Sequence, residues 1–121
     1  MKENQITLKA YSFDMDWNRH VTSRTYEKFS QEARYSLLEE NGYPLKMCIE
    51  KNLILIPLTT EVRFLNQQFA GNSITVHTQA IQVAQGVILW KHHLTGENGK
   101  TCCELSLVTE FTDSDKNKIS L

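Results

Sequence analysis

Four polar residues able to take part in acid–base chemistry occur at every second position of one short segment: Asp14, Asp16, Asn18 and His20. A carboxylate in such a cluster can act as a general base or as a nucleophile, and an imidazole can transfer a proton. Asp and Asn also favour turns, because their side chains hydrogen-bond to the nearby backbone. The spacing alone therefore leaves two interpretations open, a catalytic loop or a polar turn without chemistry.

A helix is predicted to begin directly after this segment. Thr22 or Ser23 can cap its first turn by accepting a backbone hydrogen bond. Asn41-Gly42 is predicted to end it, and residues 45–51 are expected to form a second short helix. An apolar stripe at helical spacing lies between, formed by Tyr26, Phe29, Ala33 and Leu37. The start of this helix presents N–H groups that can polarise a carbonyl or hold an oxyanion.

Alternating apolar and polar residues predict strands on both sides of the helix. One strand is expected before it, within residues 6–13, and about four follow it, within residues 53–65, 74–81, 87–94 and 101–111. Pro57 indicates that the first of these four begins at an edge or a bulge. Asn98-Gly99 predicts a type I′ hairpin turn, and the polar tail from about residue 113 is expected to fray. The order of elements predicts a single α+β domain over residues 1–121.

Composition excludes several classes of function. The 121 residues include 13 Lys and Arg and 14 Asp and Glu, which give a formal net charge of −1. This balance argues against nucleic acid as a partner. No apolar run approaches the length of a membrane span, and no signal peptide is evident. An odd number of cysteines, with an adjacent pair, is a poor disulfide framework. We expect buried thiols and a cytoplasmic location, with cysteines at positions 48, 102 and 103.

The polar segment and its continuation resemble the hotdog-fold acyl-CoA thioesterases of the 4-hydroxybenzoyl-CoA thioesterase type. The family pattern is Asp-x-Asp, a short turn, often His-Val, and a Tyr ten residues after the second Asp. The portion Asp-x-Asn-x-His-Val also resembles the acyl-ACP thioesterases. The similarity extends along nearly the whole chain, through Glu-Ala-Arg in the helix, Asn-Gly-Tyr-Pro at its exit, and the strand, turn and strand that start at residues 61, 71 and 74.

The resemblance implies a long helix wrapped by a curved antiparallel sheet, and it assigns roles to individual residues. Asp16 corresponds to the catalytic carboxylate, which attacks the thioester carbonyl or activates a water molecule. The backbone N–H near Ser23 would polarise that carbonyl, and Asn18 and His20 would orient water or substrate and move a proton. The candidates for contacts with the substrate are Trp17, Tyr26 and Arg63.

Other polar residues are expected to be structural. Asp14 is interpreted as fixing the loop, and Glu32 as a paired or solvated charge on the helix. The strand histidines lack the spacing of metal ligands. Arg19 stands where many family members have Gly, which shifts weight toward the acyl-ACP-like pattern.

The function expected from this resemblance is hydrolysis of an acyl-CoA or acyl-ACP thioester, without a metal or an organic cofactor. No partnership with nucleic acid or membrane is expected. The family assembles as homodimers or homotetramers, and an exposed edge strand gives a physical reason for such pairing. Three alternatives remain open: a hotdog protein that binds acyl thioesters without cleaving them, a dehydratase or hydratase acting on the same carrier, and a structural interaction domain.

Overall fold

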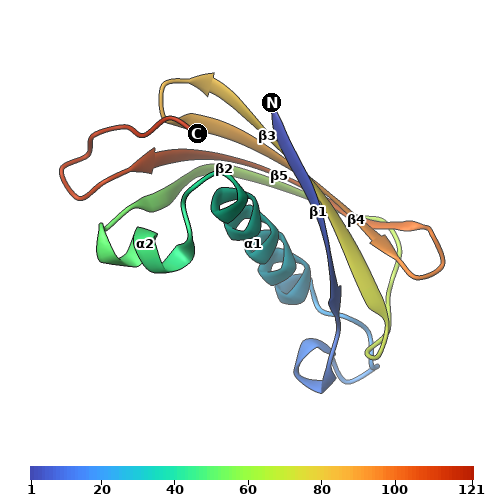
Figure 1. Ribbon diagram of the computed structural model, residues 1–121. Coiled ribbons are helices and arrows are strands. Elements are labelled where there is room, and N and C mark those ends of the chain that lie inside the picture. The colour runs from blue at the N-terminus through green and yellow to red at the C-terminus, as the bar shows by residue number, and fades with distance from the viewer.

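A curved antiparallel sheet wraps around one long helix in the computed structural model, which describes all 121 residues (Figure 1). The sheet has five strands in the order β1-β3-β4-β5-β2. The elements follow one another as β1 (Lys2–Lys9), the 3-10 turn η1 (Ser12–Asp14), α1 (Ser23–Glu40), α2 (Leu45–Glu50), β2 (Ile54–Phe64), β3 (Ser73–Ala84), β4 (Val87–Gly96) and β5 (Thr101–Thr112). The predicted α+β architecture is confirmed, and the first strand ends at Lys9 rather than continuing to residue 13.

Local signals in the sequence determine where α1 begins and ends. The Thr22 side chain accepts a hydrogen bond from the Thr25 backbone N–H over 3.3 Å, which satisfies one of the free donors of the first turn. Gly42, with a φ of +92°, adopts the left-handed conformation after the helix. The predicted bounds of this helix are therefore confirmed.

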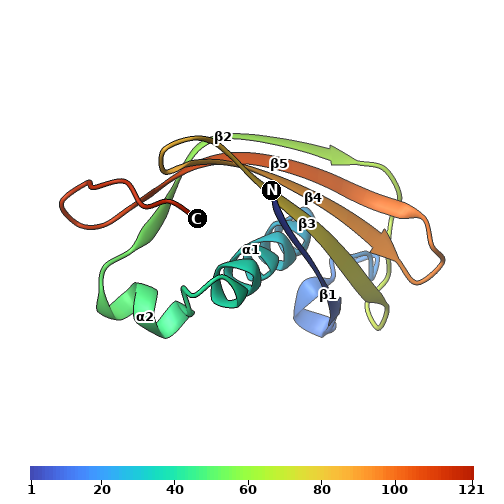
Figure 2. The ribbon, with the colours of Figure 1, turned by 45° about the horizontal axis from the view of Figure 1, so that its top comes forward.

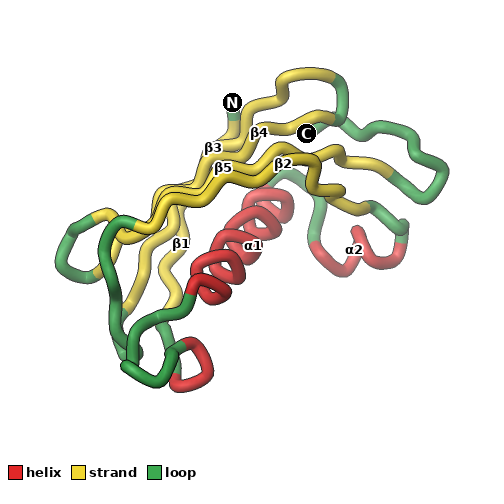
Figure 3. Tube along the Cα trace, turned by 180° about the vertical axis from the view of Figure 1, so that it is seen from behind, coloured by secondary structure: helices red, strands yellow, loops and turns green.

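The helix lies in the concavity of the sheet (Figures 2 and 3) and packs mainly against β1 and β3. One hydrophobic cluster joins the first half of α1 to β1, β3 and the start of β5, and includes Tyr26, Phe29 and Ala33. A second cluster joins its second half to β4 and β5, and includes Leu37, Trp90 and Phe111. Because α1 lies closer to β1 and β3, the side of the concavity beneath β2 is less covered.

Strand β2 is an edge strand that pairs only with β5. Its register shifts between Pro57 and Thr59, which confirms the predicted edge or bulge. Three of its large apolar side chains are about half exposed: Ile54, Leu58 and Phe64.

Two expectations about the end of the chain were wrong. Gly99 has a positive φ of 77° but Asn98 does not, so the hairpin is not a type I′ turn; a longer loop forms, with a shift of register after Leu94. The tail does not fray, because the N–H of Ile119 donates to Phe111 O over 2.8 Å, and Ile119 packs against the second hydrophobic cluster. No helix is both long and apolar enough to cross a membrane.

Candidate active site

The predicted catalytic segment forms a tight hairpin that leads directly into α1. The backbone N–H of Asp16 donates to His20 O over 2.8 Å, and the N–H of Arg19 donates to Asp16 O over 2.9 Å. Arg19 has a φ of +64°, the left-handed conformation that glycine adopts most readily. The turn is therefore made with Arg at a position whose conformation favours Gly.

The carboxylate of Asp16 lies at the neck of this hairpin and is exposed. Its Oδ1 accepts hydrogen bonds from the backbone N–H groups of Asn18, over 2.8 Å, and His20, over 3.1 Å. Oδ2 has no partner within the protein. The structure thus brings together Asp16, Asn18 and His20 on one hairpin, and leaves one oxygen of the carboxylate unpaired.

A second loop holds the hairpin from the side (Figure 3). The N–H of Val21 donates to Gln68 O over 2.7 Å, and the N–H of Ala70 donates to Arg19 O over 3.0 Å. The His20 imidazole lies edge-on to the Phe69 ring, with 4.8 Å between the ring centroids. These contacts fix the direction of His20, and sequence reasoning did not identify Phe69 or Gln68.

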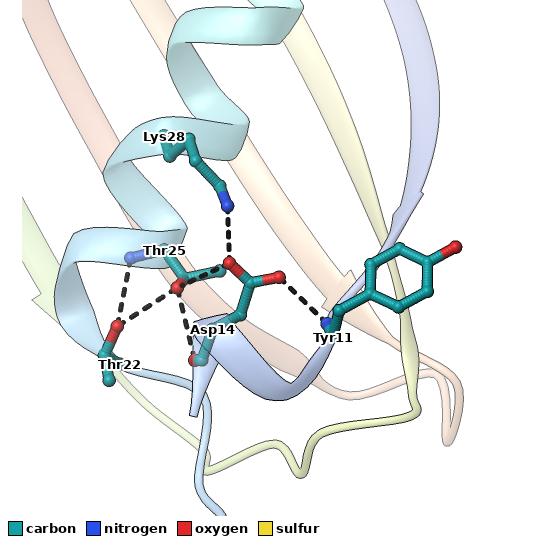
Figure 4. A network of polar contacts seen from close by, with 5 residues as sticks. All are labelled: Tyr11, Asp14, Thr22, Thr25 and Lys28. Carbon is teal, nitrogen blue, oxygen red and sulfur yellow. Dashed lines mark hydrogen bonds and ion pairs between the residues drawn. The ribbon is translucent and has the colours of Figure 1, made fainter. Parts of the chain in front are cut away.

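Asp14 fixes the base of the hairpin, as predicted (Figure 4). Only 4% of its surface is exposed. Its carboxylate accepts from the Tyr11 backbone N–H over 2.8 Å and pairs with the Lys28 ammonium. The Thr25 hydroxyl donates to the Asp14 backbone carbonyl over 3.2 Å. Burial opposes ionisation, but the hydrogen bonds from Lys28 and Tyr11 and the charge of Lys28 outweigh it and lower the pKa of Asp14.

The N-terminus of α1 faces a cavity of about 400 Å³, lined by Val21, Ser23, Tyr26, Phe64, Leu65, Asn66 and Gln67. The backbone N–H of Ser23 has no acceptor within the protein, as expected for the first residue of a helix. Tyr26 is 4% exposed, and its buried hydroxyl has no hydrogen-bond partner. The cavity therefore offers the unpaired N–H of Ser23 beside an apolar wall.

The remaining predicted residues differ in their placement. Trp17 lies at the tip of the hairpin and is 96% exposed, so it packs against nothing in a single chain. Arg63 does not join the site. Its neighbour Val62 packs on the core, so alternation turns Arg63 to the other face of the sheet, where it lies 4.0 Å from Glu104.

Two cations beside the site were not identified from the sequence. Arg24 and Lys28 line a polar cavity of about 470 Å³ with the backbone of the hairpin base and the first turn of α1. Their spacing of four residues at the start of the predicted helix was the available signal, because it places both on one face.

The other reactive side chains lie away from the hairpin. All three cysteines are buried and unpaired, as predicted. No three or more His, Cys, Asp or Glu side chains are grouped so that they could hold a metal ion. His92 is buried, whereas the adjacent His93 is exposed on the opposite face.

Comparison with known proteins identifies the family of this chain. The sequence matches a family described as the thioesterase-like superfamily over residues 13–121. A search of curated proteins gave no match.

Solved structures share the fold at low sequence identity. A 1,4-dihydroxy-2-naphthoyl-CoA thioesterase from Synechocystis superposes with a TM-score of 0.86 at 15% identity, over 98% of this chain and 89% of that one. A gentisyl-coenzyme A thioesterase gives 0.87 at 15% identity, over 98% and 95%. A Staphylococcus aureus protein solved in complex with CoA gives 0.85 at 16% identity, over 100% and 78%. The predicted hotdog fold is confirmed.

Proposed function

Since this chain belongs to the thioesterase-like superfamily, we propose that it hydrolyses an acyl thioester to a free acid and a thiol. The observation that carries the proposal is the placement of an exposed carboxylate, Asp16, on a tight hairpin that leads into a helix whose first N–H is unpaired. Such a pair supplies both a nucleophile or base and an oxyanion donor, the two groups that acyl transfer needs.

Asp16 acts on the thioester carbonyl in one of two ways. It attacks the carbonyl carbon, releasing the thiolate and forming a mixed anhydride that water then hydrolyses, or it removes a proton from a water molecule that attacks. In both routes the carbonyl oxygen becomes negative, and the N–H of Ser23 at the positive end of α1 stabilises it. The thiolate takes a proton as it leaves.

Asn18 and His20 assist this chemistry. The backbone N–H groups of both residues donate to the Asp16 carboxylate. Their side chains therefore project from the same hairpin as the carboxylate. An imidazole can both accept and donate a proton, which suits His20 for moving the proton to the thiolate. The Asn18 amide orients the water molecule or the substrate.

Tyr26 and Trp17 serve the substrate. The apolar wall of the cavity beside Ser23, which includes the Tyr26 side chain, is suited to part of the acyl group. Trp17, exposed at the tip, and Arg24, at the start of α1, are suited to the carrier. We favour CoA over acyl carrier protein, because a protein of the same fold was solved with CoA. The three unpaired thiols suit the reducing cytoplasm.

We also propose that the chain works as a homodimer or a homotetramer. Strand β2 leaves one edge of its backbone unpaired along 11 residues, and Leu58 is 50% exposed there. An edge of this length, with apolar side chains, is a template for pairing with a second copy. The molar mass from light scattering tests this, and Leu58→Glu is expected to shift the mass toward the monomer.

A second candidate function is binding of acyl thioesters without cleavage. The observation that favours it is the engagement of Asp16 Oδ1 in two backbone hydrogen bonds, which a purely structural turn also requires.

The two functions are separated by thiol release from short, long and aromatic acyl-CoAs, with thermal-shift binding of the same compounds. Turnover with any of them supports the hydrolase. Binding without turnover supports the alternative function, and the absence of both overturns the two proposals.

A further inference from the structure

A polar network crosses the core beneath the middle of α1. Nη1 of Arg34, on the helix, lies 3.1 Å from Nε2 of His92 on β4. Nδ1 of the same imidazole lies 2.8 Å from the hydroxyl of Thr78 on β3. His92 and Thr78 are 2% and 0% exposed. The network therefore holds the guanidinium in a fixed direction, at the less covered side of the concavity.

The charge of Arg34 is not neutralised by the protein. The three ion pairs of the structure join Lys28 with Asp14, Arg63 with Glu104, and His77 with Glu3. Burial lowers the pKa of Arg34 to about 10, so the group stays charged at neutral pH. A guanidinium has five N–H donors, and only one of its nitrogens has a partner here. An anion bound beside this partly buried cation would offset the cost of removing its charge from water.

Space for an anion exists on both sides of the guanidinium. A cavity of about 400 Å³ between α1 and β2 runs from Arg24 to Arg34 and reaches Pro57 and Leu107. Its wall also carries the charged side chains of Glu27, Lys28 and Glu32. A second cavity of about 170 Å³ shares Gln31, Arg34, Pro57 and Leu107 with the first. The two cavities together form a groove beside the helix, with Arg34 where they meet.

We propose that Arg34 binds a carboxylate at the far end of this groove, and that the substrate's acyl group carries that carboxylate. This inference rests on the proposed hydrolysis of an acyl thioester. Planar carboxylates match the two parallel donors of a guanidinium. The substrate class is thus a thioester of a dicarboxylic acid.

The helix sets the length of such an acyl group. Ser23, the expected oxyanion donor, and Arg34 are eleven positions apart, about 16 Å along the helix axis. Helical side chains lean toward the N-terminus, which brings the guanidinium closer to the thioester. At about 1.2 Å per bond of an extended chain, the carbon chain of an eight-carbon diacid spans about 8 Å, roughly half of this distance, and the long Arg34 side chain covers part of the rest.

The test compares suberyl-CoA with octanoyl-CoA, which differ by a terminal carboxylate in place of a methyl group. We expect the wild type to show the higher kcat/KM for suberyl-CoA. Arg34→Met is expected to lower kcat/KM for suberyl-CoA about 10- to 100-fold, as for a lost charged hydrogen bond, and to leave octanoyl-CoA nearly unchanged. Arg34→Lys keeps the charge but lacks the two parallel N–H donors of the guanidinium. An intermediate loss of kcat/KM for suberyl-CoA in this variant supports the site. Lys46→Met, an exposed cation on α2, is the control for net charge.

Binding of free suberate, measured by calorimetry against octanoate, separates the two proposals. Suberate binding that Arg34→Met abolishes supports the carboxylate site, even if no thioester is cleaved and the hydrolase proposal fails. Hydrolysis with no preference for suberyl-CoA, and no suberate binding, overturns the site alone. A lower molar mass of Arg34→Met without any change in preference also overturns it, because the carboxylate then comes from a second copy of the chain.

Discussion

The backbone N–H of His20 donates to Oδ1 of Asp16 over 3.1 Å, and this bond closes the hairpin that presents the carboxylate. Asn18 donates to the same oxygen over 2.8 Å. The side chain proposed to react is therefore also the side chain that shapes its own loop. Oδ1 holds the hairpin, and Oδ2 is the oxygen available to the proposed reaction.

Because only Oδ1 makes the backbone hydrogen bonds, we expect two substitutions of Asp16 to differ in their effects on activity and stability. Asp16→Asn keeps an oxygen that accepts both N–H groups, so the free energy of unfolding is expected to stay within about 0.5 kcal/mol of wild type. It removes the nucleophile or base, so thiol release is expected to fall about 10²- to 10⁴-fold. Asp16→Ala is expected to lose the same activity and about 1 kcal/mol of stability as well. Steady-state thiol release and urea unfolding measure the two effects.

Unchanged thiol release in Asp16→Asn would show that the carboxylate serves only the turn. Equal stability of the Asn and Ala variants would show that the two hydrogen bonds do not hold the hairpin.

Arg19 carries a backbone cost that a glycine would remove. A left-handed conformation costs a non-glycine residue about 1–2 kcal/mol, and the φ of Arg19 is +64°. A glycine relieves this strain, but it also loses more conformational entropy on folding, which offsets about 0.5–1 kcal/mol of the gain. We therefore expect Arg19→Gly to raise the free energy of unfolding by about 0.5–1 kcal/mol. Arg19→Ala is the matched control, because it removes the side chain but keeps the strained φ. A gain of the same size in both variants would place the cost in the side chain instead.

Local patterns were sufficient to predict most of the fold. Thr22 and Gly42 cap α1 through contacts with their own neighbours, and alternation placed Ile6 and Leu8 on the inner side of β1. The hairpin of Asp16 was also predicted as a loop, because its hydrogen bonds span at most four residues.

Contacts between distant segments could not be predicted in this way. Arg34 and His92 are separated by 58 residues, and they meet because of the order of strands in the sheet. Phe69 and His20 are also far apart in the sequence and come together only in the folded chain. The face on which Arg63 lies could not be predicted for a different reason, since a strand residue changes face with a shift of one position. The tail folds back through Ile119, an apolar residue within a polar stretch.

The buried carboxylate of Asp14 at the base of the hairpin is expected to contribute to stability rather than to catalysis. Asp14→Asn removes the ion pair with Lys28 and weakens the bond from Tyr11, so we expect a loss of about 2 kcal/mol in the free energy of unfolding. Lys28→Met is the partner variant, with an expected loss of about 1 kcal/mol, because the Lys28 side chain is 53% exposed. Because the pKa of Asp14 is lowered, its contribution is present at neutral pH and is lost as the pH falls below about 4. Urea unfolding of the two single variants and the double variant measures the coupling, and strictly additive losses would contradict a direct interaction.

His92 predicts how stability depends on mild acid. Burial, and then the charge of Arg34, lower the pKa of His92 to about 3, whereas an unfolded chain titrates near 6.5. Between these values the unfolded state binds a proton that the folded state does not, so stability falls as the pH decreases below 6.5. From pH 7 to pH 5 this predicts a loss of about 2 kcal/mol for one histidine, in a range where carboxylates scarcely titrate. His92→Gln keeps an acceptor for Arg34 and removes the titration, so its free energy of unfolding is expected to change less over the same range. Urea unfolding at pH 7, 6 and 5 measures both proteins, and parallel curves for wild type and variant would show that His92 is not held neutral by the fold.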